Sequence, residues 1–110
     1  MRRNIIDSDG RFFGWFETKK AIKEFEEGTY FDGHNHCGNV GRSQWLRESL
    51  FLTASGRWVR GVSGGTQSQR VRDCELMTPV EVANWFISNG EEDPEGATEE
   101  VLSLMASKEV

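Results

Sequence analysis

The fold is decided by residues 43–76, which read SQWLRESLFLTASGRWVRGVSGGTQSQRVRDCEL. Residues 50–53 are β-favouring and run into Ala54-Ser55-Gly56, a tripeptide that suits a tight hairpin connection with glycine where φ is positive. Residues 57–62 continue as the returning strand, and residues 70–76 are expected to add a third strand. The stretch therefore predicts a three-stranded antiparallel sheet.

A helix signal follows the last of these strands. Thr78-Pro79-Val80-Glu81 places a hydroxyl at the N-cap, a proline at the first helical position and a carboxylate at the third, which together predict a capping box. Val82, Trp85 and Phe86 share one helical face, and this apolar stripe can lie across a sheet. Asn89-Gly90 marks the expected end of the helix.

The N-terminal third predicts a β-hairpin followed by a helix. Residues 4–6 and 11–16 flank Asp7-Ser8-Asp9-Gly10, whose Asp-Gly pair favours a hairpin turn. Residues 17–27 have the spacing of an amphipathic helix that ends at Gly28. The apolar side of this helix would consist of Ala21, Ile22 and Phe25.

The remaining segments complete the predicted architecture. Residues 34–42 are rich in glycine and asparagine and are expected to form an irregular loop. Residues 91–96, EEDPEG, form an acidic linker, and Thr98 is expected to cap a short final helix. The apolar face of that helix would consist of Val101, Leu102 and Met105. Together these elements predict one small α+β domain over residues 1–110.

The composition is that of a small aromatic-rich domain. The hydrophobic fraction is 36%, but four Trp and seven Phe put much apolar area into few side chains. No stretch approaches the roughly 20 apolar residues of a membrane span, and the first residues lack the apolar run of a secretory signal. Two cysteines are too few for a disulfide framework, so we expect a cytoplasmic protein with free thiols. A single bridge between Cys37 and Cys74 remains an alternative.

Charge is distributed unevenly along the chain. The net charge is −5, yet residues 42–72 hold six arginines and one glutamate, whereas residues 73–110 hold ten acidic residues and one lysine. Arginine binds phosphate with its planar fork and aromatic rings stack on bases, so a single-stranded nucleic-acid or phosphate-binding face is one hypothesis. Its residues are Arg57, Trp58, Arg60, Arg70 and Arg72. The favoured alternative is that these arginines pair with acidic side chains of the same fold or of a dimer.

Histidine and cysteine suggest a further hypothesis. His34, His36, Cys37 and Cys74 offer the nitrogen and sulfur ligands that zinc prefers, although their spacing does not match that of known zinc knuckles. Cys37 with His34 or His36 could also form a thiolate nucleophile, but neighbours in one loop seldom have the required geometry. The favoured alternative is a polar loop and, elsewhere, a half-buried cysteine in a strand.

Two groups of residues suggest protein binding. Aromatic side chains at Phe12, Phe13 and Trp15 are of the kind that dominates interfaces, although the favoured alternative is that they belong to the core. An acidic group could engage a basic partner or mimic nucleic acid. It consists of Glu91, Glu92, Asp93 and Glu95.

The run Glu48-x-Leu50-x-x-Thr53-x-x-Gly56-x-Trp58, with Thr78-Pro79-Val80-Glu81 and Trp85 after it, resembles small bacterial, phage or mobile-element proteins. This resemblance implies no activity and no site residue. The function that we expect is a non-enzymatic protein-binding module, acting as a regulator, adaptor or inhibitor of a nucleic-acid-handling complex. Self-association is the alternative form of protein binding, nucleic-acid binding is the second hypothesis, and zinc binding is the third. No cofactor and no membrane partner are expected.

Overall fold

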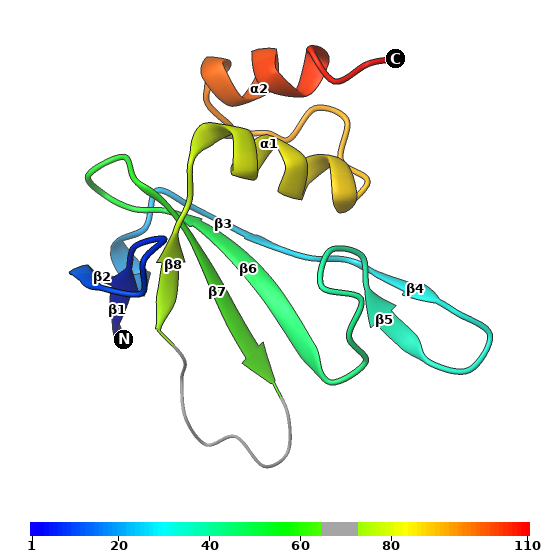
Figure 1. The fold of residues 1–110 in the computed structure, drawn as a ribbon, viewed down its shortest axis with the longest axis horizontal. Coiled ribbons are helices and arrows are strands. Elements are labelled where there is room, and N and C mark those ends of the chain that lie inside the picture. The colour runs from blue at the N-terminus through cyan, green and yellow to red at the C-terminus, as the bar shows by residue number, and fades with distance from the viewer. Residues whose placement is uncertain (65–72) are drawn as a thin grey trace.

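The computed structural model describes residues 1–64 and 73–110 (Figure 1). Its elements are β1 (Arg2–Ile6), β2 (Phe12–Glu17), the 3-10 turn η1 (Thr18–Lys20), β3 (Lys23–Glu26), β4 (Thr29–Phe31), β5 (His36–Gly38), β6 (Leu46–Leu52), β7 (Trp58–Gly64), β8 (Cys74–Leu76), α1 (Pro79–Ser88) and α2 (Glu99–Ala106). One sheet has the strand order β2-β1-β8-β7-β6-β3, and β4 and β5 form a separate hairpin. The predicted α+β class is confirmed.

Both predicted hairpins of the main sheet are present. In the first, β1 and β2 are antiparallel, and the Asp7 carboxylate accepts the backbone N–H groups of Asp9 and Arg11 in the turn. In the second, Gly56 adopts a φ of 86°, which lets the chain reverse between β6 and β7. The turn chemistry at Asp7–Gly10 and Ala54–Gly56 therefore fixes the local connections.

The predicted three-stranded antiparallel sheet is present as β6, β7 and β8, but it is part of a larger sheet that the first hairpin and β3 also join. β8 pairs antiparallel with β7 on one side and parallel with β1 on the other. The predicted third strand, residues 70–76, is present over Cys74–Leu76, while residues 70–72 lie outside the described part of the chain. The result is a six-stranded mixed sheet.

The prediction of a helix over residues 17–27 is wrong. Glu17 caps only the single turn η1, and the chain then extends as β3 and pairs antiparallel with β6. Ile22, which was expected on the buried helical face, is 56% exposed, whereas Phe25 packs against Trp58 and Phe86. Pairing with β6 places alternate side chains of this segment on the core-facing side of the sheet. This gain outweighs the helical propensity of the segment.

The region expected to be irregular contains a small hairpin. β4 and β5 pair over three residues each, so only part of residues 34–42 is loop. Asp32 builds the turn, because its carboxylate accepts the backbone N–H groups of His34 and Asn35 at 2.8 and 2.7 Å. This hairpin extends away from the main sheet (Figure 1).

Both C-terminal helices are present as predicted. Thr78 and Glu81 form the capping box of α1, and Gly90 ends that helix with a φ of 78°. Thr98 caps α2 by accepting the backbone N–H of Val101. The two helices lie on one side of the sheet (Figure 1).

The sheet separates two apolar clusters. On the helix side, Leu50 and Trp58 pack with Phe86 of α1 and Val101 of α2. On the other face, Ile5, Phe16, Phe51, Val59 and Cys74 form the second cluster. The rings of Phe16 and Phe51 are only 5.2 Å apart although three strands lie between β2 and β6. In a flat sheet these strands would be about 19 Å apart, so the sheet is strongly curled around this cluster.

Candidate functional site

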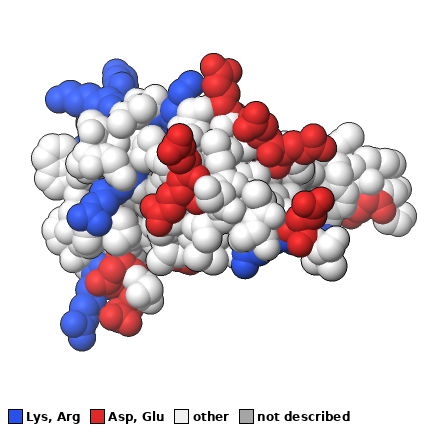
Figure 2. All heavy atoms as spheres, turned by 90° about the horizontal axis from the view of Figure 1, so that it is seen from above, with Lys and Arg blue, Asp and Glu red and all other residues white. Residues whose placement is uncertain are grey.

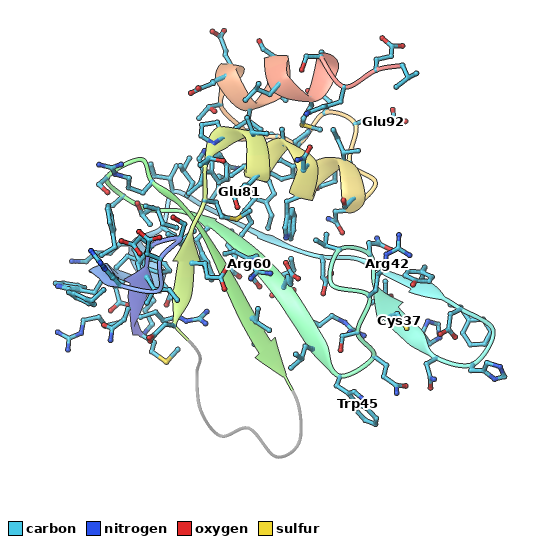
Figure 3. The ribbon with its side chains drawn as sticks, in the orientation of Figure 1. Cys37, Arg42, Trp45, Arg60, Glu81 and Glu92 are labelled. Atoms are coloured by element: carbon cyan, nitrogen blue, oxygen red, sulfur yellow. The ribbon has the colours of Figure 1, made fainter. Side chains whose placement is uncertain are left out.

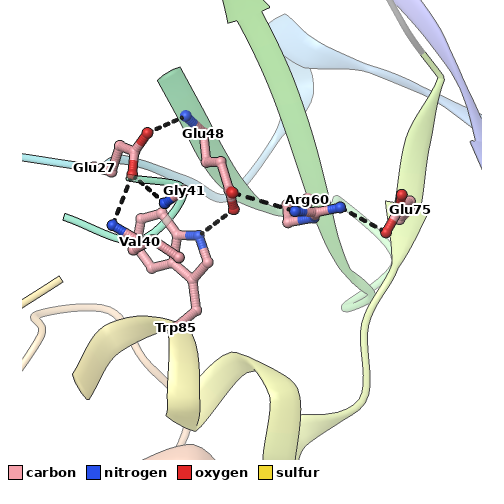
Figure 4. A network of polar contacts seen from close by, with 7 residues as sticks. All are labelled: Glu27, Val40, Gly41, Glu48, Arg60, Glu75 and Trp85. Carbon is pink, nitrogen blue, oxygen red and sulfur yellow. Dashed lines mark hydrogen bonds and ion pairs between the residues drawn. The ribbon is translucent and has the colours of Figure 1, made fainter. Parts of the chain in front are cut away.

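A buried carboxylate anchors the connection between β5 and β6 (Figure 4). Glu27 is 6% exposed, and its two oxygens accept the backbone N–H groups of Val40, Gly41 and Glu48 at 2.9, 3.0 and 2.9 Å. Gly38 leaves room for this group, because a Cβ at that position would overlap the carboxylate. The arrangement is structural: it satisfies three N–H groups that the curled chain turns inward.

A second buried carboxylate joins three strands to α1. Glu48 of β6 accepts the indole N–H of Trp85 at 3.2 Å and pairs with Arg60 of β7, also at 3.2 Å. Arg60 in turn binds Glu75 of β8 at 2.8 Å. Burial disfavours the charged guanidinium, but the bond to Glu75 and the charge of Glu48 outweigh this effect and raise the pKa of Arg60. For Arg60, the alternative that arginines pair within the fold is therefore the observed one.

A cleft of about 420 Å³ opens between this network and α1. Its polar lining consists of Glu48, Arg60, Glu75, Glu81, Asn84 and Ser88. Arg60 holds two of the three carboxylates, and the third, on Glu81, accepts the backbone N–H of Thr78 in the capping box. The charged groups of this cleft are thus engaged in holding the fold.

A second hollow of about 470 Å³ lies between the C-terminal ends of α1 and α2, and we call it the acidic groove. Its apolar lining consists of Ile87, Leu102, Met105 and Ala106, and its acidic lining consists of Glu91, Glu92, Asp93 and Glu109. Ile87 is 42% exposed, so part of the apolar lining faces solvent. The structure thus brings together three of the four predicted acidic residues, while Glu95 lies outside the lining.

Acidic and basic side chains occupy different parts of the surface on the helix side. Viewed onto the helices, acidic side chains lie over the middle of the molecule and most basic side chains gather toward its left-hand end (Figure 2). Glu92 follows the end of α1, opposite to the end where Glu81 begins it (Figure 3). Glu92, which lines the acidic groove, thus marks the end of α1 at which the groove lies.

The predicted aromatic group lies together on β2, and we call it the aromatic edge. Phe12, Phe13 and Trp15 are 66%, 44% and 58% exposed. β2 is the first strand of the sheet, and its register with β1 shifts so that Phe13 is left without a directly opposite residue. Arg2 lies over the ring of Trp15 at 5.2 Å and Arg57 over the ring of Phe13 at 5.5 Å. Large rings are thus held at the surface next to two cations.

The residues proposed for nucleic-acid binding do not form one face. Trp58 is 6% exposed and belongs to the helix-side cluster, and Arg60 is held by two carboxylates. Arg57 instead lies against the aromatic edge. Arg70 and Arg72 lie outside the described residues.

The residues proposed for zinc binding are divided between two parts of the molecule. His34, His36 and Cys37 lie on the β4–β5 hairpin, where Figure 3 labels Cys37, whereas Cys74 lies in the cluster inside the curled sheet. Over residues 1–64 and 73–110, no three His, Cys, Asp or Glu side chains come together as metal ligands would. Both cysteines are buried and free.

The environment of Cys37 does not activate its thiol. Burial raises the pKa of Cys37, and the charge of Asp32 and its hydrogen bond from the thiol raise it further. The ring of His36 packs on Phe31 with centroids 5.2 Å apart. Burial likewise raises the pKa of Cys74, although the charge of Arg3 opposes this effect. Both thiols are therefore protonated at neutral pH. A cysteine nucleophile would instead need the thiolate form.

No sequence pattern identifies the buried polar network. Glu27 falls outside the apolar side of the helix predicted over residues 17–27, although it is buried in a strand connection. One signal for Glu48 was available, since it is the only acidic residue among the six arginines of residues 42–72. Phe31 and Trp45 are 61% and 66% exposed, and no sequence pattern marks either ring as exposed.

Comparisons of the chain with protein-family models, with curated proteins and with solved structures find no match. None of the helices in the described parts of the chain has the length and apolarity needed to cross a membrane.

Proposed function

We propose that this chain is a non-enzymatic protein-binding module whose acidic groove receives a basic segment of a partner protein. The observation that carries this proposal is the combination in one hollow of an apolar lining with four carboxylates. A segment that fits must supply an apolar side chain for Ile87 and Leu102, and lysine or arginine for the surrounding acids.

The chemistry of the groove favours a partner with a phosphate-binding surface. Proteins that handle nucleic acids carry clustered lysine and arginine, and these residues would meet Glu91, Glu92 and Asp93 in the groove. A module that occupies such a surface competes with nucleic acid for it, which is the action of a regulator or inhibitor. We place this action in the cytoplasm, where both thiols would stay reduced.

The proposal is tested with an amphipathic peptide of about 15 residues that carries lysines on one side and leucines on the other. Binding is followed by fluorescence anisotropy at two salt concentrations. The test variant combines Glu91→Gln, Glu92→Gln and Asp93→Asn, and the control variant combines Asp9→Asn, Glu24→Gln and Glu26→Gln. Both variants remove three carboxylates, so they change net charge equally.

We expect the groove variant to weaken binding about tenfold at low salt and the control variant to weaken it about twofold or less. Ile87→Ser, which removes part of the apolar lining without changing charge, should weaken binding at both salt concentrations. Equal losses in the groove and control variants would mean that the peptide responds only to net charge, and the acidic groove would be rejected as the binding site.

A second candidate function is supported by the aromatic edge. Exposed rings beside arginines are the arrangement with which proteins stack and neutralise single-stranded nucleic acid. This candidate transfers the nucleic-acid hypothesis from Trp58 to Trp15 and retains Arg57. It predicts that a labelled single-stranded oligonucleotide binds with an affinity that falls steeply with salt, and that Trp15→Ala removes this binding. Oligonucleotide affinity that is unchanged in Trp15→Ala would exclude it.

A further inference from the structure

The cleft between the polar network and α1 holds more negative than positive charge. Carboxylates from Glu48, Glu75 and Glu81 line it, and Arg60 is the only cationic side chain among the described residues of this lining. Arg60 lies between Glu48 and Glu75 and pairs with both (Figure 4). Glu81 belongs to the opposite wall, on α1 (Figure 3). Three carboxylates against one guanidinium leave an excess of negative charge, which favours a positively charged ligand.

These carboxylates have acceptor positions beyond those that hold the fold. An ionised carboxylate accepts hydrogen bonds at about four positions on its two oxygens. Glu48 is 8% exposed, yet its contacts with Trp85 and Arg60 are both 3.2 Å, longer than the roughly 2.8 Å of a strong charged hydrogen bond. In the part of the chain that the structure describes, one oxygen of Glu75 and one of Glu81 have no partner. A cation in the cleft can therefore be bound without breaking the bonds of the network.

The uncharged part of the lining fits a short alkyl chain. Apolar contact is offered by Val40, Met77 and the indole of Trp85, and further hydrogen bonds by Asn84 and Ser88. Apolar surface with a few converging polar groups is the usual composition of a small-molecule site. From the charge and the lining together, we propose that the cleft binds a small organic cation, an alkylammonium or alkylguanidinium group whose charged end lies among the carboxylates.

A cation of this kind is either a free amine or the side chain of a lysine or arginine of another protein, and the two sources share one chemistry. The cleft is separate from the acidic groove, because Asn84 and Ser88 line the cleft whereas Ile87 lines the groove. The inference therefore holds whether or not the acidic groove binds a basic segment.

Binding is tested with butylammonium as the probe and the indole N–H resonance of Trp85 as the readout in NMR. This N–H donates to Glu48 in the cleft, and Trp85 is 3% exposed, so its resonance reports on the cleft and not on the outer surface. We expect a saturable shift with a dissociation constant of about 1 mM. Methylammonium, which lacks most of the alkyl chain, should bind about tenfold more weakly. Butyrate and butanol carry a similar chain without positive charge and should leave the resonance unchanged.

Two conservative variants test the carboxylates. Glu75→Gln and Glu81→Gln each remove a negative charge and keep an acceptor oxygen, and glutamine at position 81 still completes a capping box. Each should weaken butylammonium binding about fivefold. The control is Glu24→Gln, which removes an exposed carboxylate on β3, outside the lining, and should weaken binding about twofold or less. Circular dichroism that matches the wild type shows that each variant is folded.

A lysine with a blocked backbone, N-acetyl-lysine N-methylamide, distinguishes the two sources of the cation. Binding as tight as that of butylammonium would assign the cleft to a protein side chain. Saturable binding of butylammonium with binding of the blocked lysine at least about tenfold weaker would assign the cleft to a free amine.

Several outcomes would overturn the proposal. The Trp85 resonance could move linearly, without saturation, up to about 100 mM butylammonium. Butyrate could shift it as much as butylammonium does, or Glu75→Gln and Glu81→Gln could bind butylammonium as tightly as Glu24→Gln. Shifts confined to the amides of Glu92 and Asp93 would reject the cleft and assign the cation to the acidic groove.

Discussion

Glu27 shows how one side chain can organise a connection that has no regular structure of its own. Its carboxylate accepts three backbone N–H groups from the start of β6 and from the preceding turn. Most buried backbone donors are paired within secondary structure, and here the Glu27 carboxylate supplies the acceptor instead. The connection that leads into β6 thus depends on an acidic side chain.

Replacement of Glu27 by alanine is therefore expected to be strongly destabilising. Loss of three acceptor contacts should lower the free energy of unfolding by about 3 kcal/mol, measured by urea denaturation. Glu27→Gln keeps one acceptor oxygen and should cost less. The control is Glu24→Ala, which removes an exposed carboxylate from the adjoining strand β3 and should change stability by about 0.5 kcal/mol or less. Equal effects at the two positions would contradict the role assigned to Glu27.

At the scale of elements, the β4–β5 hairpin is stabilised by the ionised form of Asp32. Backbone N–H groups of Asn35 and His34 bind its carboxylate and lower the pKa of Asp32 below the ordinary value of 3.8. A carboxyl whose pKa is lower in the folded state stabilises that state above the ordinary pKa, and this contribution is lost as pH falls through the lower, folded pKa.

Acidification should consequently weaken this hairpin turn. We expect the amide resonances of His34 and Asn35 to shift in an NMR titration as the pH falls through the lowered pKa of Asp32. Asp32→Asn retains an acceptor oxygen and should remove most of this pH dependence while keeping the turn, whereas Asp32→Ala should lose the turn at every pH. The account would be contradicted if the backbone amide resonance of His34 changed with pH in the same way in the wild type and in Asp32→Asn.

The elements that the sequence predicted are those with short-range signals. Gly56 requires a particular backbone conformation, and Thr78 with Glu81 closes a capping box within four residues. The segment 17–27 has no such signal, because its spacing suits both a helix and a strand with Phe25 on the inner face. Its structure is decided by β6, a strand about 25 residues away, and no local pattern encodes that partner.

The candidate surfaces were predictable to a similar extent. Exposed acids followed from their position in a polar linker after α1, but the exposure of the aromatic run did not, because its side chains were expected in the core. The burial of Trp58 and the separation of Cys74 from Cys37 depend on contacts between distant segments, such as the parallel pairing of β1 with β8, and could not be predicted either.

For the whole molecule, the shared sheet makes two apolar clusters into one cooperative unit. Consecutive residues of β6 point to opposite faces: Leu50 packs against the helices, and Phe51 packs inside the curl with Phe16. Neither cluster can form without β6, and β6 is held between β7 and β3. We therefore expect that damage on either face destabilises both clusters together.

Leu50→Ala and Phe51→Ala test this expectation, because each removes a fully or nearly buried side chain from a different cluster and should lower the free energy of unfolding by about 3 kcal/mol. The helix-side cluster is followed by the near-ultraviolet circular dichroism of Trp58 and Trp85, and the inner cluster by hydrogen exchange at Ile5 and Val59. In both variants the two measurements should give the same loss of stability, while Ile22→Ala, at a 56% exposed site, should change neither. Phe51→Ala could instead accelerate hydrogen exchange at Ile5 and leave the tryptophan transition unchanged. The first hairpin would then unfold independently, and only β6 and the strands that flank it would unfold together with the helix-side cluster.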